Sequence, residues 1–244
     1  MKWRSLSESG SYDDTRPLRQ IFAERKELIA KYVPADVQAI HDRAIAVLKA
    51  QGFAARALGV GAKSLPFALH DHDGKMVTSS DLLAKGRLVL LFIRGRWCPF
   101  CVGQMEAMNY VAAQIVASGA SLAAISPQTE KQAYFMHDQH KLAFPLLVDT
   151  HNEVARQFGL AYRASQEQQD LYRLAYRASQ EQQDLYRRTF VNLPLVNGDD
   201  SWTLPIPATY IIDGDGTVLF ASANEDYTER PEPLEILSKL EGIG

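Results

Sequence analysis

Two cysteines lie three residues apart in the segment Trp97-Cys98-Pro99-Phe100-Cys101, and they are the only cysteines of the chain. A pair at this spacing can close a small disulfide, and a thiolate at the start of a helix is stabilised by the helix dipole and by nearby cations. Trp97 can shield the pair, and Pro99 suits the first turn of a helix. Because two cysteines cannot form a disulfide framework, we expect a reactive role, in thiol–disulfide exchange or peroxide reduction.

The flanking residues place this pair between a strand and a helix. The continuous apolar run 88–93 is typical of a central strand buried on both faces, and residues 100–118 predict a helix with an apolar face. Arg94 and Arg96 stand between the two elements. The sequence leaves open whether these arginines face the cysteines or the solvent.

Composition and charge give no reason to expect a metal, a cofactor, nucleic acid or a membrane as partner. One Cys-x-x-Cys supplies two of four zinc ligands, and the pairs His70/His72 and His137/His140 are more consistent with solvent-exposed polar sequence than with ligand sets. The net charge is −3, and no apolar run is long enough to span a bilayer. The N-terminus has no signal-peptide core, so we expect a cytoplasmic protein.

The chain divides into an N-terminal helical extension, residues 1–62, and a larger domain, residues 63–244. In the extension, apolar residues between Val37 and Leu48 recur at helical spacing, and an earlier helix ends at Pro34. We expect the extension to pack on the domain, with a dimer contact as the alternative.

The larger domain predicts an α/β fold in which strands alternate with helices before a final hairpin and helix. The expected strands are 88–93, 121–126, 144–148, 208–213 and 217–221, and the expected helices are 100–118, 131–140 and 233–240. This order indicates a thioredoxin-like mixed sheet with helices on both faces.

Pro207 precedes the first strand of the hairpin. In thioredoxin-like folds a cis-proline at this point packs against the active-site cysteines, so we expect the Ile206–Pro207 bond to be cis. The alternative is a trans proline that opens an edge strand.

Residues 160–173 are repeated without change as residues 174–187. Such identity indicates a recent copying event or deliberate engineering. If the segment is helical, the insertion nearly preserves its faces, because fourteen residues are close to four full turns. Leu160, Ala164 and Leu171 would then share one face with Leu174, Ala178 and Leu185. We expect a lengthened helix, a looped-out copy or altered oligomer packing rather than a catalytic role.

Four segments carry a resemblance to a known family: residues 92–101, 124–128, 198–205 and 226–233. In these the chain resembles the peroxiredoxin-like branch of the alkyl hydroperoxide reductase/thiol-specific antioxidant (AhpC/TSA) family. Peroxiredoxins carry Pro-x-x-x-Thr-x-x-Cys, in which the final cysteine attacks peroxide. Laid without gaps, this pattern puts Arg94 at the proline, Cys98 at the threonine and Cys101 at the attacking cysteine. A thioredoxin-type alignment instead makes Cys98 the exposed attacker and Cys101 its resolving partner, and we lean slightly to Cys98.

The resemblance implies a thiol-dependent antioxidant enzyme that reduces hydrogen peroxide or organic hydroperoxides. One cysteine would become a sulfenic acid, the other would condense with it, and thioredoxin or a similar dithiol would reduce the disulfide. A second hypothesis is a general thiol–disulfide oxidoreductase that acts on protein disulfides. A third is a non-catalytic, redox-responsive binding protein. A homodimer is left open.

Overall fold

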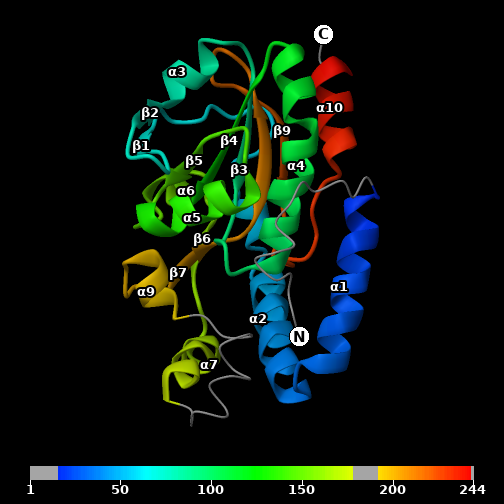
Figure 1. The fold of residues 1–244 in the computed structure, drawn as a ribbon, viewed down its shortest axis with the longest axis vertical. Helices are drawn as coiled ribbons and strands as arrows, with labels where there is room; N and C mark the ends of the chain where they lie inside the picture. The colour runs from blue at the N-terminus through cyan, green and yellow to red at the C-terminus, as the bar shows by residue number, and fades with distance from the viewer. Residues whose placement is uncertain (1–15, 178–191, 243–244) are drawn as a thin grey trace.

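The computed structural model describes residues 16–177 and 192–242 (Figure 1). Its core is a five-stranded sheet in the order β5-β4-β3-β8-β9. The strands are β3 (Leu88–Phe92), β4 (Ser121–Ser126), β5 (Leu146–Val148), β8 (Ala208–Ile212) and β9 (Val218–Ala223). The β3–β4 and β4–β5 pairs are parallel, whereas β8 is antiparallel to both β3 and β9. The expected mixed sheet is confirmed.

Strand β3 lies at the centre of the sheet, and all five of its residues are buried. Side chains alternate between the two faces of a strand. Val89 and Leu91 accordingly join one apolar cluster, while Leu88, Leu90 and Phe92 join a second cluster behind the sheet. The continuous apolar run is explained by burial on both faces.

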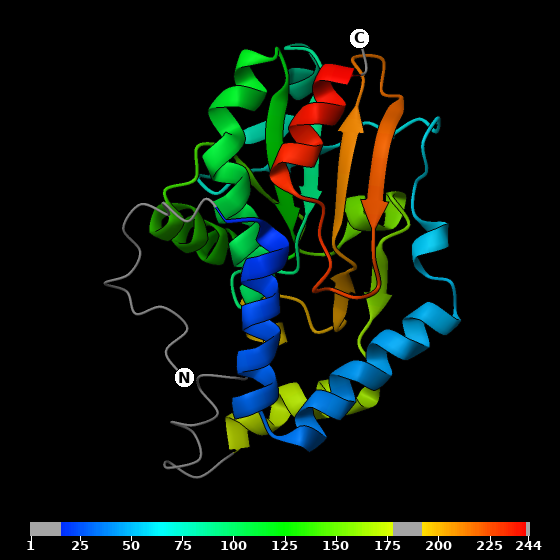
Figure 2. The same cartoon turned by 90° about the vertical axis from the view of Figure 1, so that its right-hand side faces the viewer.

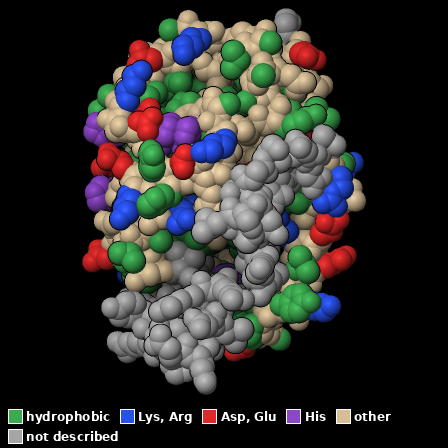
Figure 3. All heavy atoms as spheres, viewed as in Figure 1, with side chains coloured by type: hydrophobic (Ala, Val, Ile, Leu, Met, Phe, Trp, Pro, Cys, Tyr) green, Lys and Arg blue, Asp and Glu red, His purple; other side chains and the backbone are tan. Residues whose placement is uncertain are grey.

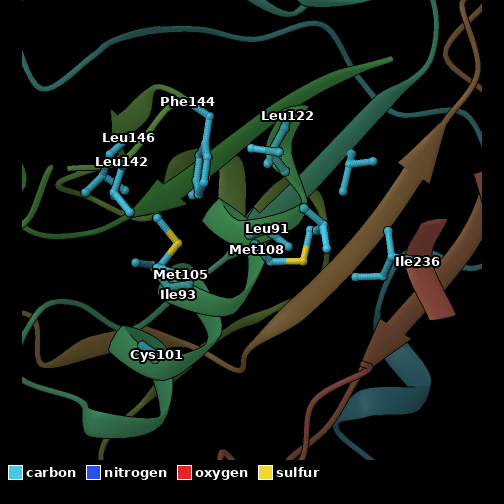
Figure 4. Packing of buried hydrophobic residues seen from close by; sticks show 14 of the residues in the cluster. Leu91, Ile93, Cys101, Met105, Met108, Leu122, Leu142, Phe144, Leu146 and Ile236 are labelled. Carbon is cyan, nitrogen blue, oxygen red and sulfur yellow. The ribbon is translucent and has the colours of Figure 1, made fainter. Parts of the chain in front are cut away.

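Helices cover both faces, as the sequence predicted. One face carries α4 (Pro99–Ala117), α5 (Glu130–His140) and α10 (Pro233–Gly242), whose apolar residues share the first cluster (Figures 2 and 4). The other face carries α3 (Ser79–Leu83) and α6 (Glu153–Gln157). Figure 4 shows Cys101 on α4 near Met105 and Ile93, so the functional helix is anchored in the core.

The N-terminal extension forms two helices, α1 (Leu18–Tyr32) and α2 (Ala35–Ala50), separated at Pro34, followed by a short 3-10 turn at Ala54–Arg56. Leu18, Ile21 and Phe22 of α1 are buried in the same cluster as α4. The extension therefore packs on the domain, as expected. The domain boundary at residue 62 and the alternative of a dimer contact stay predictions.

Two small two-stranded sheets complete the described fold. One is a hairpin of β1 (Ala68–His70) and β2 (Met76–Thr78), and the other pairs β6 (Ala161–Arg163) with the distant β7 (Thr203–Pro205). Among the described residues between β6 and β7 are the helices α7 (Gln166–Arg177) and α9 (Leu193–Asn197).

The first copy of the duplicated segment is not one helix. Residues 161–163 form β6, and α7 begins only at Gln166, so Leu160 and Ala164 do not share a helical face with Leu171. The tetrapeptide Leu-Ala-Tyr-Arg enters a strand at 160–163 but lies within α7 at 174–177. Pairing with β7 selects the strand in the first copy, because tertiary contacts override local propensity. The remainder of the second copy, including Ala178 and Leu185, lies outside the described residues.

The histidines depart from the expected exposure. His70 is exposed, but the rings of His72 and His137 stack with centroids 3.4 Å apart, and His140 Nδ1 lies 3.1 Å from the buried Glu106 carboxylate. No group of three or more potential metal ligands occurs in the described part of the chain. Side chains of both charge signs are spread over the face seen in Figure 3. Among the helices described, none is long and apolar enough to cross a membrane.

Candidate redox site

The turn that follows β3 brings the cysteine pair to the N-terminus of α4. Gly95 has a φ of +135°, which favours glycine, and a Cβ there would lie 2.8 Å from the Trp97 indole nitrogen. The Cys98 N–H then donates to the Gly95 carbonyl at 3.1 Å. Cys98 is the N-cap residue, Pro99 is the first residue of the helix, and Cys101 lies in its first turn. The predicted strand–turn–helix setting is confirmed.

Both cysteines carry free thiols, and both are buried, with 1% of Cys98 and 0% of Cys101 exposed. Cys98 is therefore not the exposed thiol that the thioredoxin-type alignment implies, and the two exposures hardly differ. Helix α1 lies over the first turn of α4 and shares the apolar cluster that contains both cysteines. The Phe22 ring lies edge-on to Phe100 with centroids 5.0 Å apart, and Arg25 donates to the Pro99 carbonyl.

Arg94 faces the cysteines and is 2% exposed. Its backbone N–H donates to Cys101 Sγ at 3.4 Å. Its guanidinium lies between the rings of Trp97 and Tyr227, with centroid distances of 4.6 and 4.3 Å. Stacking on two aromatic faces stabilises a buried cation that has left water. Arg94 thus adds both a hydrogen bond and a positive charge to the thiol site.

Arg230 approaches Cys101 from the segment between β9 and α10. Its Nη2 lies 3.6 Å from Cys101 Sγ, and its Nε donates to Gln104 Oε1 at 2.8 Å. Gln104 in turn donates to Thr209 Oγ1 of β8 at 3.2 Å. Both Gln104 and Thr209 are buried, so this chain of hydrogen bonds fixes the guanidinium relative to the sheet.

The sequence did not single out Arg230 or Gln104. Arg230 is part of segment 226–233, which carried the family resemblance, so a charged residue within that segment was the available signal. Nothing in the sequence pointed to Gln104, because a single polar residue within a helix is common.

The two thiols have opposite acidities. Burial raises the pKa of Cys98, and its role as hydrogen-bond donor to Cys101 raises it further. Burial also opposes ionisation of Cys101, but it is outweighed. The hydrogen bond from Cys98, the charge of Arg230, and the N–H and charge of Arg94 together lower the pKa of Cys101 well below that of an ordinary cysteine. The geometry therefore favours the thiolate form of Cys101 and the protonated thiol of Cys98.

The other predicted site residues separate into three groups. Trp97 is half-buried and contacts the cluster that holds the cysteines, in line with a shielding role. Arg96 is exposed and turns toward α5, where its Nη1 lies 3.0 Å from Gln132 Oε1. Pro207 is buried, but no peptide bond in residues 16–177 and 192–242 is cis, so the prediction of a cis Ile206–Pro207 bond is wrong. The bond is trans, as the alternative had it, but β8, the strand that follows, lies between β3 and β9 and is not the edge strand that the alternative expected.

Two more residues influence the site electrostatically. Burial and the charge of Arg94 lower the pKa of His41, on α2, to about 4, so this imidazole is neutral near pH 7. Burial raises the pKa of Tyr162, on β6, and the nearby Arg94 partly opposes that effect. The side chains of His41 and Tyr162 are therefore both neutral near pH 7, and neither adds a charge beside Arg94.

The mixed sheet and a cysteine pair at a helix N-terminus define a thioredoxin-like oxidoreductase. The chain belongs to the AhpC/TSA family, whose family model matches residues 60–221. The matched range includes both cysteines, Arg94 and Pro207, but ends before Arg230 and begins after α1 and α2.

Solved structures show the same fold. Peroxidoxin BcpB from Mycobacterium tuberculosis superposes with a TM-score of 0.56 at 21% identity, over 77% of this chain and 99% of that one. AhpC from Enterococcus faecalis gives 0.54 at 17% identity, over 75% and 91%. Peroxiredoxin Q from Xanthomonas campestris gives 0.52 at 16% identity, over 72% and 90%.

Curated relatives match a smaller part of the chain, at somewhat higher identity. The thiol-disulfide oxidoreductase ResA of Bacillus thuringiensis subsp. konkukian is 26% identical over 102 residues, which are 41% of this chain and 58% of that protein. ResA of Bacillus anthracis is 27% identical over 113 residues, 45% of this chain and 64% of that protein. The chain thus spans less than two thirds of the length of these relatives.

Proposed function

We propose that the chain is a thiol peroxidase in which Cys101 attacks hydrogen peroxide or an organic hydroperoxide and Cys98 resolves the product. The observation that carries this is the set of donors directed at one sulfur. Cys101 accepts hydrogen bonds from Cys98, the Arg94 N–H and Arg230, whereas Cys98 serves as donor. This reverses our sequence-based preference for Cys98.

The reaction balances with these two sulfurs and an external dithiol. The Cys101 thiolate attacks the terminal peroxide oxygen, the O–O bond breaks, and the alkoxide or hydroxide leaves as alcohol or water after protonation. Cys101 is then a sulfenic acid. The Cys98 sulfur attacks it, water leaves, and the Cys98–Cys101 disulfide forms. A dithiol protein such as thioredoxin would take up the oxidation by exchange.

Arg230 and Arg94 supply the electrostatic part of this chemistry. The guanidinium of Arg230 stabilises the thiolate before attack and can donate to the peroxide oxygens as negative charge moves toward the leaving group. Gln104 holds its Nε, which leaves Nη2 directed at the sulfur. Cys98 occupies the place of the family's threonine and donates through a thiol, which is a weaker donor than a hydroxyl.

Burial favours a small substrate. With 0% of Cys101 exposed, a disulfide on the surface of another protein has no path to this sulfur in the described arrangement. A peroxide group is small enough to enter with local side-chain motion, whereas a protein disulfide requires the cover over α4 to move. Peroxide therefore suits the first step, and the dithiol suits a later one.

The test is stopped-flow fluorescence of the reduced protein mixed with hydrogen peroxide and, separately, with an organic hydroperoxide, Trp97 being the expected reporter. We expect a second-order rate far above that of an unactivated thiolate. A rate no better than that of free cysteine with both peroxides, together with rapid reduction of insulin disulfides, would reject the proposal.

A second candidate is a thiol–disulfide oxidoreductase that acts on proteins. The observation that favours it is the Trp-Cys-x-x-Cys turn, with Cys98 at the N-cap, in a chain similar in part to ResA. The insulin measurement above decides between the two. A cytoplasmic location and a homodimer stay predictions.

A further inference from the structure

Helix α1 is attached to the segment that carries Arg230. The Glu232 carboxylate accepts hydrogen bonds from the N–H groups of Leu18 and Arg19, at 2.8 and 2.9 Å, and so caps the N-terminus of α1. Lys26, two turns further along, pairs with Glu229 at 2.7 Å. Arg230 stands between these two glutamates, and its side chain turns inward to Cys101.

The same helix also covers the cysteine turn. Arg25 donates to the carbonyl of Pro99, and Phe22 packs on Phe100. The approach at Gly103 is close, because a Cβ there would lie 2.9 Å from the Phe22 ring and nearer still to Arg25, so these side chains would have to shift. Figure 2 shows α1 beside the lower part of α4, next to the chain that leads into α10. One helix therefore contacts both the thiol turn and the arginine segment.

We propose that α1 is a cover that couples access to activation: seated, it closes over the cysteine turn and helps the Gln104 hydrogen bond to keep Arg230 against Cys101, and lifted, it opens a path to the pair and lets Arg230 withdraw. Glu232 is the main positioning residue, and Lys26 and Glu229 assist it. The proposal rests on the proposed function for its purpose. Peroxide would react in the seated state, and a dithiol protein would reach the disulfide in the lifted state.

The two attachments differ in strength. Lys26 and Glu229 are about half exposed, and exposed ion pairs contribute little to stability. Glu232 instead accepts two backbone bonds at a helix N-terminus, where a carboxylate also meets the positive end of the dipole. Removing the charge of Glu232 should therefore loosen α1 more than removing either exposed partner.

The experiment measures the Cys101 thiol directly in a Cys98→Ser background, so that a single sulfur reacts. Iodoacetamide alkylation against pH gives the apparent pKa of Cys101, and the ratio of the rates with bulky DTNB and small iodoacetamide at a fixed pH gives its accessibility. In Glu232→Gln we expect the pKa to rise by about one unit and the DTNB-to-iodoacetamide ratio to rise roughly tenfold, with Glu232→Asp in between.

Glu24→Gln is the matched control, because Glu24 lies on the same helix and pairs with Arg16 rather than with segment 229–232. We expect neither readout to change in it. If Glu232→Gln does not fold by circular dichroism, Lys26→Glu replaces it, and the exchange of both charges in Lys26→Glu/Glu229→Lys should restore the parent values. Unchanged values in the disrupting variant, or a higher ratio with an unchanged pKa, would overturn the coupling. Peroxide is not used, so failure of the peroxidase proposal would leave this result readable.

Discussion

The thiol turn, residues 94–101, and the cover over it, α1 with residues 224–232, meet at Cys101 but differ in how visible they are in the sequence. The turn lies inside the range matched by the AhpC/TSA family model, and the cover lies outside it on both sides. The turn supplies the two sulfurs. The cover supplies Arg230, the aromatic ring of Tyr227 and the Phe22 ring that packs on Phe100.

The two regions contribute different things: the turn provides the thiol pair, and the groups around it activate one of the two thiols. Placement at a helix N-terminus is common to both cysteines, yet only Cys101 has a lowered pKa. Since the cysteines share the helix dipole, the distinction comes from the groups that the fold aims at one sulfur, and part of that set belongs to the cover.

The largest expected effect comes from the turn itself. In Cys101→Ser we expect complete loss of rapid peroxide consumption, because no thiolate remains at the position that accepts the donors. Cys98→Ser should keep the first oxidation but stop turnover, since no sulfur remains to resolve the sulfenic acid. Dimedone trapping and mass spectrometry check both variants. If Cys101→Ser reacted as fast as the parent and Cys98→Ser did not, the assignment of roles would be reversed.

Arg230→Gln tests the contribution of the cover. Removing a charged donor from a developing charge should slow peroxide reaction at neutral pH roughly 100-fold. The pH–rate profile should shift upward, because the charge of Arg230 helps to lower the pKa of Cys101. Arg230→Lys keeps the charge without the fork held by Gln104, so an intermediate rate is expected. A parent-like pH–rate profile in Arg230→Gln would show that the turn activates Cys101 without help from Arg230.

His41, on α2, gives the protein a pH-dependent stability. Its pKa is lowered from 6.5 to about 4, chiefly by burial. Below pH 6.5 His41 binds a proton in the unfolded chain but not in the folded chain, so the free energy of unfolding decreases as the pH falls toward 4. At pH 5 this amounts to about 2 kcal/mol of unfolding free energy.

Urea denaturation of the parent and of His41→Leu at pH 7 and pH 5 measures this contribution. We expect the parent to lose about 2 kcal/mol more than the variant between the two values. Equal losses would mean that His41 takes up its proton without unfolding of its surroundings.

Replacing Cys98 separates its two roles. Serine retains a donor for the Cys101 thiolate, whereas alanine removes it and leaves the sulfur with fewer partners. We expect the pKa of Cys101 to be about one unit higher in Cys98→Ala than in Cys98→Ser, as measured by iodoacetamide alkylation. Identical values would assign the activation to the arginines alone.

The sequence predicted the sheet and the setting of the cysteines because both depend on local patterns. The apolar run at 88–93 and Pro99 before a helical stretch each have a physical meaning within a few residues. Arg230 and Cys101 are 129 positions apart, so no local pattern connects them. The burial of Cys98 was missed for a similar reason, because the apolar cluster that contains it includes residues of α1, far away in the sequence.

The duplicated segment also shows that local sequence does not determine structure by itself. Residues 160–163 and 174–177 are identical in sequence, yet one enters a strand and the other a helix. Residues 161–163 pair with β7, whereas residues 174–177 continue α7. Local sequence therefore sets what a segment can form, and its neighbours set what it does form.

Of the variants discussed for the peroxide reaction, Arg96→Gln is expected to change the peroxide rate and the Cys101 pKa least, in contrast to Arg230→Gln. Arg96 is as close to Cys98 in sequence as any charged residue, and the sequence left its direction open. In the structure its guanidinium lies 3.0 Å from Gln132 and over the ring of Phe135, both on α5, and not at the sulfurs. Because exposed charges are screened by water and salt, we expect the peroxide rate and the Cys101 pKa to stay within twofold and a few tenths of a unit of the parent values. A loss comparable to that of Arg230→Gln, measured in the same stopped-flow assay, would show that proximity in the chain matters more here than the direction of the side chain.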